Sequence, residues 1–348
     1  MKLKKEVLTF YLLIIIVLVA SFFAPNVLPE KYISDAVLII EDPHNEKGRL
    51  DSYGIIMSFY HYTGLGKLNY NIIALIQIII ISILVRRLGI PKNFHRFFLS
   101  NFVVAALIFI MPVYLSIPTK EFLNLIFIYI IVKILKEKEV VSLKKLAFLI
   151  TLFFLFGYFY RIYYVLIPPV AIAVSAVSKL KTRFKLVNIF LTSILICIFI
   201  SFSYGLVKGE YMSYSAREKL NEQRINESNA QTAIVSPVKP DSLLGESTSI
   251  FYGYFSVNFP VEGLKFYNKP QSLLFVFWQF SLITALLINF SKEIKFKRRT
   301  KQKWIFYFLI SYLAIQGIFE PDLGSSIRHK LGILPLIYEA IFYNRSRY

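Results

Sequence analysis

The chain has 348 residues, of which 56% are hydrophobic and only 18% are charged. Runs such as 72–85 and 103–113 are apolar on every face of a helix, which indicates contact with lipid or complete burial and excludes an ordinary soluble protein. The formal net charge of +19 could suggest nucleic acid, but the basic residues cluster at the ends of apolar segments. Topology and anionic lipid explain that clustering, so we expect membrane lipid and no nucleic acid as partners.

Ten apolar segments predict membrane helices. The first follows three lysines and resembles a signal peptide, but it is long for one and Pro25 follows it directly, so we expect it to be retained. The last is short and carries Glu339, and it either spans the membrane or dips in and returns. In chain order the predicted segments are 7–24, 70–88, 97–116, 122–135, 146–160, 162–178, 186–207, 271–290, 304–319 and 331–343.

The stretch 146–178 is too long for one upright helix, and Arg161 interrupts it near the middle. Basic residues bracket it at both ends. Two short helices that meet at an outer turn satisfy both facts and place Arg161 at the outer surface. We expect Pro168 and Pro169 to kink the second of these helices.

Charge fixes the orientation of these segments. With the N-terminus in the cytoplasm, the inner stretches hold most of the 40 Lys and Arg but about a quarter of the 21 Asp and Glu. The sequence therefore predicts one all-α, polytopic transmembrane domain over residues 1–348, with both ends cytoplasmic and two large outer loops at 26–69 and 208–270. The first loop includes an apolar-aromatic stretch, 55–62, that we expect to lie along the surface. All cytoplasmic connections are short, so the working surface faces away from the cytoplasm.

Three tight outer turns, at 116–121, 158–163 and 320–330, each put a cation beside an apolar segment, against the general charge bias. Lys120, Arg161 and Arg328 stand at the depth of a lipid-linked phosphate. Arginine donates two parallel hydrogen bonds to such a group, and lysine acts as a point charge. We therefore predict an anion site, although each cation could instead extend to lipid headgroups.

The same turns supply further candidates. Glu121, Glu320 and Asp322 could deprotonate an attacking hydroxyl, although such acids commonly solvate loops or pair with nearby cations. His329 could act as a base or stay neutral between its two cationic neighbours, and Lys330 would join the anion site. Tyr160 and Tyr163 offer faces for sugars, or belong to an interfacial aromatic belt. The single cysteine, Cys197, and the four scattered histidines show no ligand spacing, so we expect neither metal nor cofactor.

These turns resemble those of Wzy-type polysaccharide polymerases, integral membrane glycosyltransferases with a GT-C-like layout. The likeness rests on Ser-Ile-Pro-Thr-Lys-Glu at 116–121, Tyr-Arg-Ile-Tyr at 160–163, a long outer loop before the last helix pair, and Gly-Ser-Ser-Ile-Arg-His-Lys at 324–330 before a proline-containing last helix. It covers most of the chain in topology and four short stretches in sequence. An arginine-rich motif ending in glycine, described in some members, has no convincing copy in 208–270.

The resemblance implies transfer of a growing glycan from undecaprenyl pyrophosphate onto a new lipid-linked repeat unit, at the outer face of the bacterial inner membrane. It implies that Arg161, Arg328 and Lys120 bind pyrophosphate or acidic sugar, and that Glu121, Glu320 or Asp322 is the base. A flippase and a chain-length regulator would be partners.

Three other classes remain open. A GT-C glycosyltransferase with a lipid-phosphate sugar donor would use an acidic pair in the first outer loop, and Glu41-Asp42 would serve. A membrane acyltransferase should show an inner His/Arg signature, which His61 and His95 do not form. A transporter or flippase would place ionisable groups near the midplane, whereas the apolar centres here carry almost none.

Overall fold

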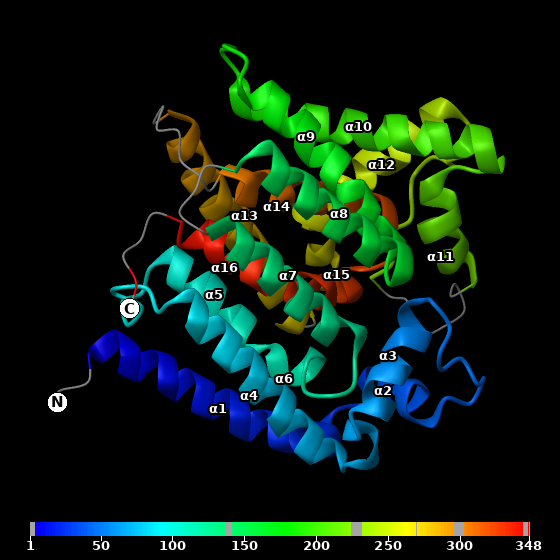
Figure 1. Ribbon diagram of the computed structural model, residues 1–348. Helices are drawn as coiled ribbons and strands as arrows, with labels where there is room; N and C mark the ends of the chain where they lie inside the picture. The colour runs from blue at the N-terminus through cyan, green and yellow to red at the C-terminus, as the bar shows by residue number, and fades with distance from the viewer. Residues whose placement is uncertain are drawn as a thin grey trace. The chain divides into compact units, whose positions relative to one another are not determined.

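The computed structural model describes residues 4–136, 141–223, 232–268, 270–295, 303–343 and 347 (Figure 1). Within these ranges the chain forms helices and no β-strand, apart from two isolated bridges, Pro91 with Arg347 and Ala233 with Asp322. The predicted all-α fold is therefore confirmed for this part of the chain. Some cations used to orient the helices lie outside the described residues: Lys2, Lys138, Lys297, Arg298, Arg299, Lys301 and Arg345.

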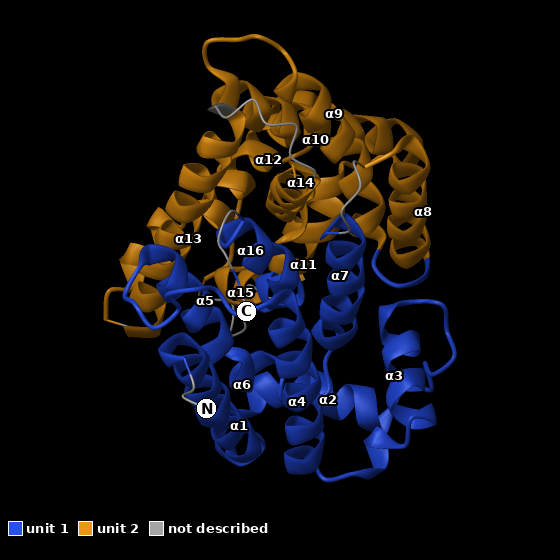
Figure 2. Ribbon diagram, turned by 60° about the vertical axis from the view of Figure 1, so that its left-hand side comes forward, with its two compact units in different colours: residues 1–137, 159–161, 328–348 blue, residues 138–158, 162–327 orange. Residues whose placement is uncertain are grey.

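The chain divides into two compact units (Figure 2). Unit 1 comprises Met1–Glu137, Phe159–Arg161 and Arg328–Tyr348, and unit 2 comprises Lys138–Tyr158 and Ile162–Ile327. The three residues 159–161 thus belong to unit 1 although the chain on both sides of them belongs to unit 2. The expectation of one transmembrane domain over residues 1–348 stays a prediction.

Unit 1 is built around α7, which packs against α3, α4 and α16. Helix α1 packs along α4, α5 and α6, and it leaves the other side of its surface apolar and exposed, at Leu8, Leu12, Ile15 and Val19 among others. The helices of unit 1 are α1 (Lys5–Val27), α2 (Glu30–Glu41), α3 (Ser52–Tyr62), η1 (Leu65–Lys67), α4 (Tyr70–Leu88), α5 (Leu99–Phe109), α6 (Met111–Tyr114), α7 (Lys120–Lys136) and α16 (Leu334–Ile341), with the last part of α15 (Leu323–Gly332).

Unit 2 surrounds α14, which is buried along nearly its whole length and packs against α9, α10 and α12. Every residue from 305 to 318 is buried, so this helix needs apolar side chains on all faces. The helices of unit 2 are α8 (Leu143–Phe159), η2 (Ile162–Leu166), α9 (Ile167–Ser178), α10 (Lys185–Lys208), the π-helix η3 (Tyr214–Glu218), α11 (Lys219–Gln223), α12 (Leu243–Asn258), η4 (Val261–Phe266), α13 (Pro270–Lys295) and α14 (Lys303–Phe319), with the first part of α15.

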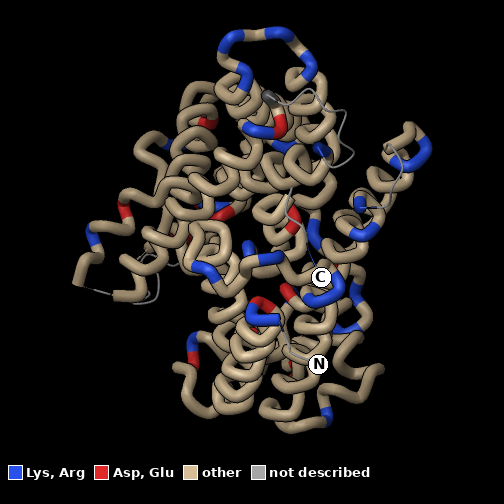
Figure 3. The backbone as a smooth tube through the Cα atoms, turned by 90° about the vertical axis from the view of Figure 1, so that its left-hand side faces the viewer, with Lys and Arg blue, Asp and Glu red and all other residues tan. Residues whose placement is uncertain are grey.

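Within the described ranges, four helices are long and apolar enough to cross a membrane: Lys5–Val27, Tyr70–Leu88, Lys185–Lys208 and Pro270–Ile294. Shorter apolar helices occupy Leu99–Tyr114, Ile162–Ser178 and Lys303–Phe319. Long stretches of the helical tube carry neither Lys or Arg nor Asp or Glu (Figure 3). These features are those of a helical membrane protein. The number of ten spans and the cytoplasmic position of both ends stay predictions.

Several predicted segments differ in detail from the structure. The segment 97–116 is broken at Ile110, immediately before the helix that contains Pro112, because proline cannot continue the hydrogen-bond ladder of the preceding turn. The expected kink at Pro168 and Pro169 is absent. Both prolines lie in the first turn of α9, where the backbone N–H that proline lacks would have no partner within the helix. The last segment contains α16, a helix of only 8 residues.

The predicted outer loop 208–270 contains more helix in its described residues than the sequence analysis expects. It contains the 16-residue helix α12, whose buried face packs on α14 and α10. Two glycines allow α12 and α14 to approach closely. A Cβ at Gly253 would stand 2.1 Å from the carbonyl oxygen of Gly317, and a Cβ at Gly317 would stand 2.6 Å from the backbone nitrogen of Tyr254. Backbone atoms cannot move aside as a flexible side chain can, so this crossing requires glycine on both helices.

We expect Gly317→Ala to lower the stability of the detergent-solubilised protein by about 1–3 kcal/mol, because the added methyl group overpacks the crossing. The matched control is Gly324→Ala, whose Cβ would meet only the Oδ1 atom of Asp322, at 3.1 Å. Thermal unfolding followed by circular dichroism measures both variants. Equal melting temperatures for the two would contradict this account of the crossing.

Candidate functional site

Glu121 is the centre of the charged cluster in unit 1. It follows a buried turn, Ser116 to Thr119, and stands in the first turn of α7. The hydroxyl of Thr119 donates to the Glu121 carboxylate and accepts from the Glu121 backbone N–H at 3.2 Å, so the turn fixes the side chain from its own end. The carboxylate is completely buried. A buried carboxylate is costly unless it is paired, so its neighbours decide whether it can exist.

Three basic side chains meet this carboxylate. The Nη2 atom of Arg161 donates to Oε1 of Glu121 at 2.8 Å, in a pair that is almost entirely buried. His329 Nε2 lies 3.5 Å from the same oxygen, and Arg328 Nε lies 3.8 Å from it. The side chain of Arg161 is buried within the protein, where it pairs with Glu121, and its expected position on the outer side of the membrane stays a prediction.

A second, more open layer lies beside this core. Arg328 Nη1 donates to Oδ2 of Asp35 at 2.7 Å, and both side chains are roughly one-third exposed. Asp35 also accepts from the hydroxyl of Tyr53 at 3.2 Å. The ammonium group of Lys120 lies over the ring of Tyr53, 3.5 Å from its centroid, which is a favourable cation–π distance. Helices α2 and α3, from the predicted first outer loop, thus supply one wall of the cluster.

The electrostatics of the cluster shift two pKa values. Burial alone would raise the pKa of Glu121, but Arg161, Arg328, His329 and Lys120 together hold it well below its usual range. The pKa of Lys120 is lowered to about 8, mainly by burial and next by the positive charge of Arg161. The cluster holds Lys120, Arg161 and Arg328 against two carboxylates, and so has room for a further negative charge.

The structure brings together six of the ten predicted site residues in unit 1: Lys120, Glu121, Tyr160, Arg161, Arg328 and His329. The hydroxyl of Tyr160 donates to the backbone carbonyl of Lys120 at 2.9 Å, so this tyrosine supports the start of α7. Lys330 also belongs to unit 1, and its side chain is completely buried. The roles assigned to these residues stay predictions.

Glu320, Asp322 and Tyr163 belong to unit 2. Glu320 accepts from Gln316 Nε2 at 3.1 Å and from the hydroxyl of Ser325. Asp322 Oδ1 accepts from the backbone N–H of Ser325 at 2.8 Å, as a residue that caps the start of α15 does. Tyr163 packs against the aromatic rings of unit 2, including Tyr164 and Phe319. Each of the three therefore has a local structural task.

A second charged cluster lies at the other end of α7. Glu339 is buried and accepts from Lys136 Nζ at 2.8 Å and from Arg347. Lys136 and Arg347 also donate to the carbonyl oxygen of Leu88, the last residue of α4, at 2.9 and 3.0 Å. The three charged residues, Lys136, Glu339 and Arg347, are those that the charge pattern assigns to the inner side. Since α7 has 17 residues, this cluster lies about 25 Å along the helix from Glu121.

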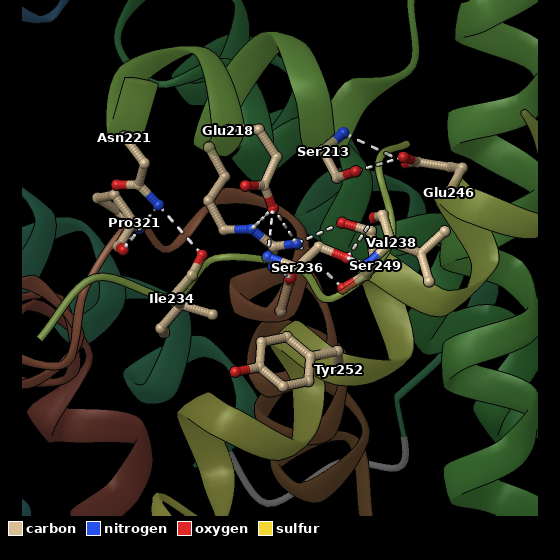
Figure 4. Close-up of polar contacts among 12 residues, drawn as sticks. Ser213, Glu218, Asn221, Ile234, Ser236, Val238, Glu246, Ser249, Tyr252 and Pro321 are labelled. Carbon is tan, nitrogen blue, oxygen red and sulfur yellow. Dashed lines mark hydrogen bonds and ion pairs between the residues drawn. The ribbon is translucent and has the colours of Figure 1, made fainter. Parts of the chain in front are cut away.

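The sequence reasoning missed Arg217, a completely buried arginine in unit 2. Figure 4 labels two of its partners, Glu218 and Ser249. Its Nε donates to Glu218 at 3.1 Å, its Nη1 to the carbonyl of Gly317 at 2.7 Å, and its Nη2 to the carbonyl of Ser249 at 3.0 Å. The guanidinium thereby joins η3 to α12 and α14 at their close crossing. The carbonyls of Ser249 and Gly317 lie 32 and 100 residues away in the chain, so no local sequence pattern predicts these two contacts.

A buried glutamate, Glu246, stands near Arg217 in the same unit (Figure 4). It accepts from the hydroxyls of Ser201 and Ser213 and from the backbone N–H of Ser213 at 3.2 Å. Both oxygens of the carboxylate are thus used to hold the beginning of the large outer loop against α10 and α12. We interpret Arg217 and Glu246 as structural residues.

The acidic pair of the first outer loop lines a polar cavity of about 330 Å³ in unit 1. Asp42 has a left-handed backbone conformation (φ 46°), and its carboxylate accepts from the N–H groups of Glu46 and Lys47 at 2.6 and 3.2 Å. Asp42 therefore holds the turn after α2. The cavity is lined by Ile39, Ile40, Glu41, Asp42, Lys47, Met57, Tyr60, His61, Gly66 and Lys67.

Comparison of the chain with protein-family models, with curated proteins and with solved structures finds no match. The chemistry of the cluster around Glu121 must therefore be argued from its own geometry.

We expect Glu121→Gln to destabilise the protein by about 3–5 kcal/mol, because it removes one partner of a buried ion pair and leaves the guanidinium of Arg161 uncompensated. The matched control is Asp35→Asn, which opens the partly exposed pair with Arg328 and should cost about 1 kcal/mol or less. Thermal unfolding in detergent at pH 7 compares the two. A larger effect of Asp35→Asn would contradict the central position of Glu121.

The same interaction predicts a pH dependence. The pKa of Glu121 is below its unfolded value of 4.5, so its stabilising contribution is complete above that pH and is lost as the pH falls further. The difference in stability between the wild type and Glu121→Gln should therefore be constant from pH 7 to about 5 and shrink below pH 4.5. A difference that grows on acidification would show that the carboxylate is not held in its ionised form.

Proposed function

We propose that the protein polymerises lipid-linked oligosaccharide repeat units into O-antigen or capsular polysaccharide at the periplasmic face of the bacterial inner membrane. The donor would be a growing glycan on undecaprenyl pyrophosphate, and the acceptor would be a single repeat unit on the same lipid. The apolar helices and the resemblance of the turns at 116–121, 160–163 and 324–330 to those of Wzy-type polymerases support this proposal.

The observation that carries the proposal is the convergence of Lys120, Arg161 and Arg328 around one buried carboxylate. These cations come from chain segments far apart in the sequence, yet they surround the same end of α7. Cations that only reached lipid headgroups would spread around the protein and point outward. Three cations beside two carboxylates leave an excess of positive charge, which suits an anionic ligand such as a pyrophosphate.

Within this proposal the two arginines have different tasks. Arg161 is buried and bound to Glu121, so it supplies a fixed positive potential. Arg328 is more exposed and could exchange its contact with Asp35 for a pyrophosphate oxygen. Glu121 would act as a positioning residue that holds the arginines in place. Fixed cations of this kind stabilise the charge that develops on a leaving pyrophosphate without first having to reorient.

A second candidate is a GT-C glycosyltransferase that uses a lipid-phosphate sugar. The cavity beside Glu41 and Asp42 favours it, because carboxylates that line a polar cavity could bind sugar hydroxyls. Asp42, however, already accepts two backbone hydrogen bonds of its own turn. The Glu121 cluster offers more charge for a pyrophosphate, and so we prefer the polymerase. A flippase and a chain-length regulator would be its partners in the cell.

Deletion of the gene from a polysaccharide-producing host should leave glycans that carry a single repeat unit. The reason is that the other enzymes would still build and export the unit, while nothing would join units together. Gel electrophoresis of the surface glycan measures this. Complete loss of glycan, or unchanged long chains, would refute the polymerase.

In the complemented host, Arg328→Ala should reduce chain extension by about a hundredfold or more, because a donor to the leaving group is lost. The matched control is Arg49→Ala, which removes another arginine of unit 1 whose side chain is 61% exposed and pairs only locally with Glu46. Membrane levels of both variants, followed by immunoblot, should equal those of the wild type. Normal chain length in Arg328→Ala would remove Arg328 from the site.

A further inference from the structure

Lys120 differs from the other cations of the cluster. Among the described residues, the ion pairs of this cluster join Glu121 and Asp35 to Arg161, Arg328 and His329, but none of them includes Lys120. The ammonium group instead lies 3.5 Å from the ring centroid of Tyr53. Its backbone is fixed, because Lys120 begins α7 and its carbonyl accepts from the hydroxyl of Tyr160. Lys120 is thus firmly placed while its nitrogen is not held by a carboxylate.

We propose that Lys120 is the proton acceptor of the transfer reaction: its nitrogen takes the proton of the attacking sugar hydroxyl. This inference rests on the proposed function and changes one of its assignments: Arg161 and Arg328 keep the task of binding the pyrophosphate, and Lys120 adds its positive charge only when it carries the proton.

The surroundings of Lys120 allow it to lose its proton near neutral pH. The groups that face it are Asp35 on α2, Tyr53 on α3, Glu121 on α7, Arg161 in the segment 159–161, and Arg328 on α15. Burial and the two arginines lower the pKa of Lys120, the two carboxylates raise it, and the result is about 8. A general base works best when its pKa lies near the working pH.

The neighbouring groups suit the role less well. The pKa of Glu121 is held well below its usual range, which makes that carboxylate a weak base. The pKa of Tyr53 is raised to about 12 by burial and by Asp35, so its hydroxyl stays protonated. The arginines remain charged at any physiological pH.

The proton balance of the step is complete. The hydroxyl oxygen of the acceptor sugar forms a bond to the anomeric carbon of the donor glycan, and the bond from that carbon to the pyrophosphate oxygen breaks. The electron pair leaves with undecaprenyl pyrophosphate, and the hydroxyl proton moves to Nζ of Lys120. A positive charge therefore appears on Lys120 while negative charge builds on the leaving group beside it, and the two stabilise each other.

The test uses the purified full chain in proteoliposomes, with the single-repeat lipid-linked oligosaccharide from the deletion host as substrate. Lys120→Arg keeps the positive charge but cannot release a proton. We expect it to bind undecaprenyl pyrophosphate within about threefold of the wild type and to extend chains about 10²- to 10⁴-fold more slowly. The wild-type rate should rise with pH and level off above about 8, whereas the residual rate of the variant should be independent of pH.

A second variant gives a chemical rescue. Lys120→Cys should be inactive, and treatment with 2-bromoethylamine should restore extension by rebuilding an amine side chain at this position. Cys197 is buried, so modification should be confined to position 120. The pH profile of the rescued enzyme should shift to lower pH, because the sulfur atom makes the new amine less basic.

The outcomes separate the two proposals. Full extension by Lys120→Arg with the wild-type pH profile, or loss of undecaprenyl pyrophosphate binding in that variant, would overturn the role of Lys120 as proton acceptor and leave the polymerase intact. Failure of the bromoethylamine treatment to restore activity would also overturn it. Failure of the wild type itself to extend chains would overturn the polymerase, and the role of Lys120 with it.

Discussion

The buried carboxylate of Glu121 imposes the strongest constraint on unit 1. An ionised carboxylate with no exposed surface exists only where cations and hydrogen-bond donors replace its lost hydration. Here the hydroxyl of Thr119 and the guanidinium of Arg161 do so directly, and Arg328 and His329 add positive potential. This single requirement draws the start of α7, the segment 159–161 and helix α15 to one place. Through Asp35, Arg328 also ties in the first outer loop.

Much of the fold could be predicted from hydropathy. Every predicted membrane segment contains a helix in the structure, because long apolar runs permit little else. The interruptions were harder to predict. Pro112 breaks a segment and Pro168 begins a helix, and the same residue type is consistent with either outcome until the neighbouring turn is known. Helix α12 was not predicted, because its length and polarity resemble those of an ordinary loop. Its burial also depends on Gly253 and Gly317, which lie 64 residues apart in the chain.

The sequence could indicate which cations belong to the cluster around Glu121, but not how they pair. Lys120, Arg161 and Arg328 could be identified because cations in tight outer turns oppose the usual charge bias. That they surround Glu121 could not be derived, since the pairing joins residues 40 apart in one case and 293 apart in the Asp35–Arg328 pair. Arg217 shows the opposite situation. Its Nε and both terminal nitrogens donate to neighbours in the fold, so it is fixed as a structural residue, whereas the amine of Lys120 has no carboxylate partner in the described chain.

The chain order of these partners also has a consequence for biosynthesis. The ribosome synthesises Asp35 and Glu121 long before Arg328, which lies 293 residues after Asp35. Helices α1 to α7 are therefore complete before the partners of the Asp35 and Glu121 carboxylates have been made. Of these partners, Arg161 is synthesised first. Because Arg328–Tyr348 return to unit 1 after Ile162–Ile327 of unit 2, the cluster around Glu121 is completed only after most of unit 2 has been synthesised. Until Arg328 and His329 have been synthesised, the buried carboxylate of Glu121 therefore lacks part of the positive charge that stabilises it.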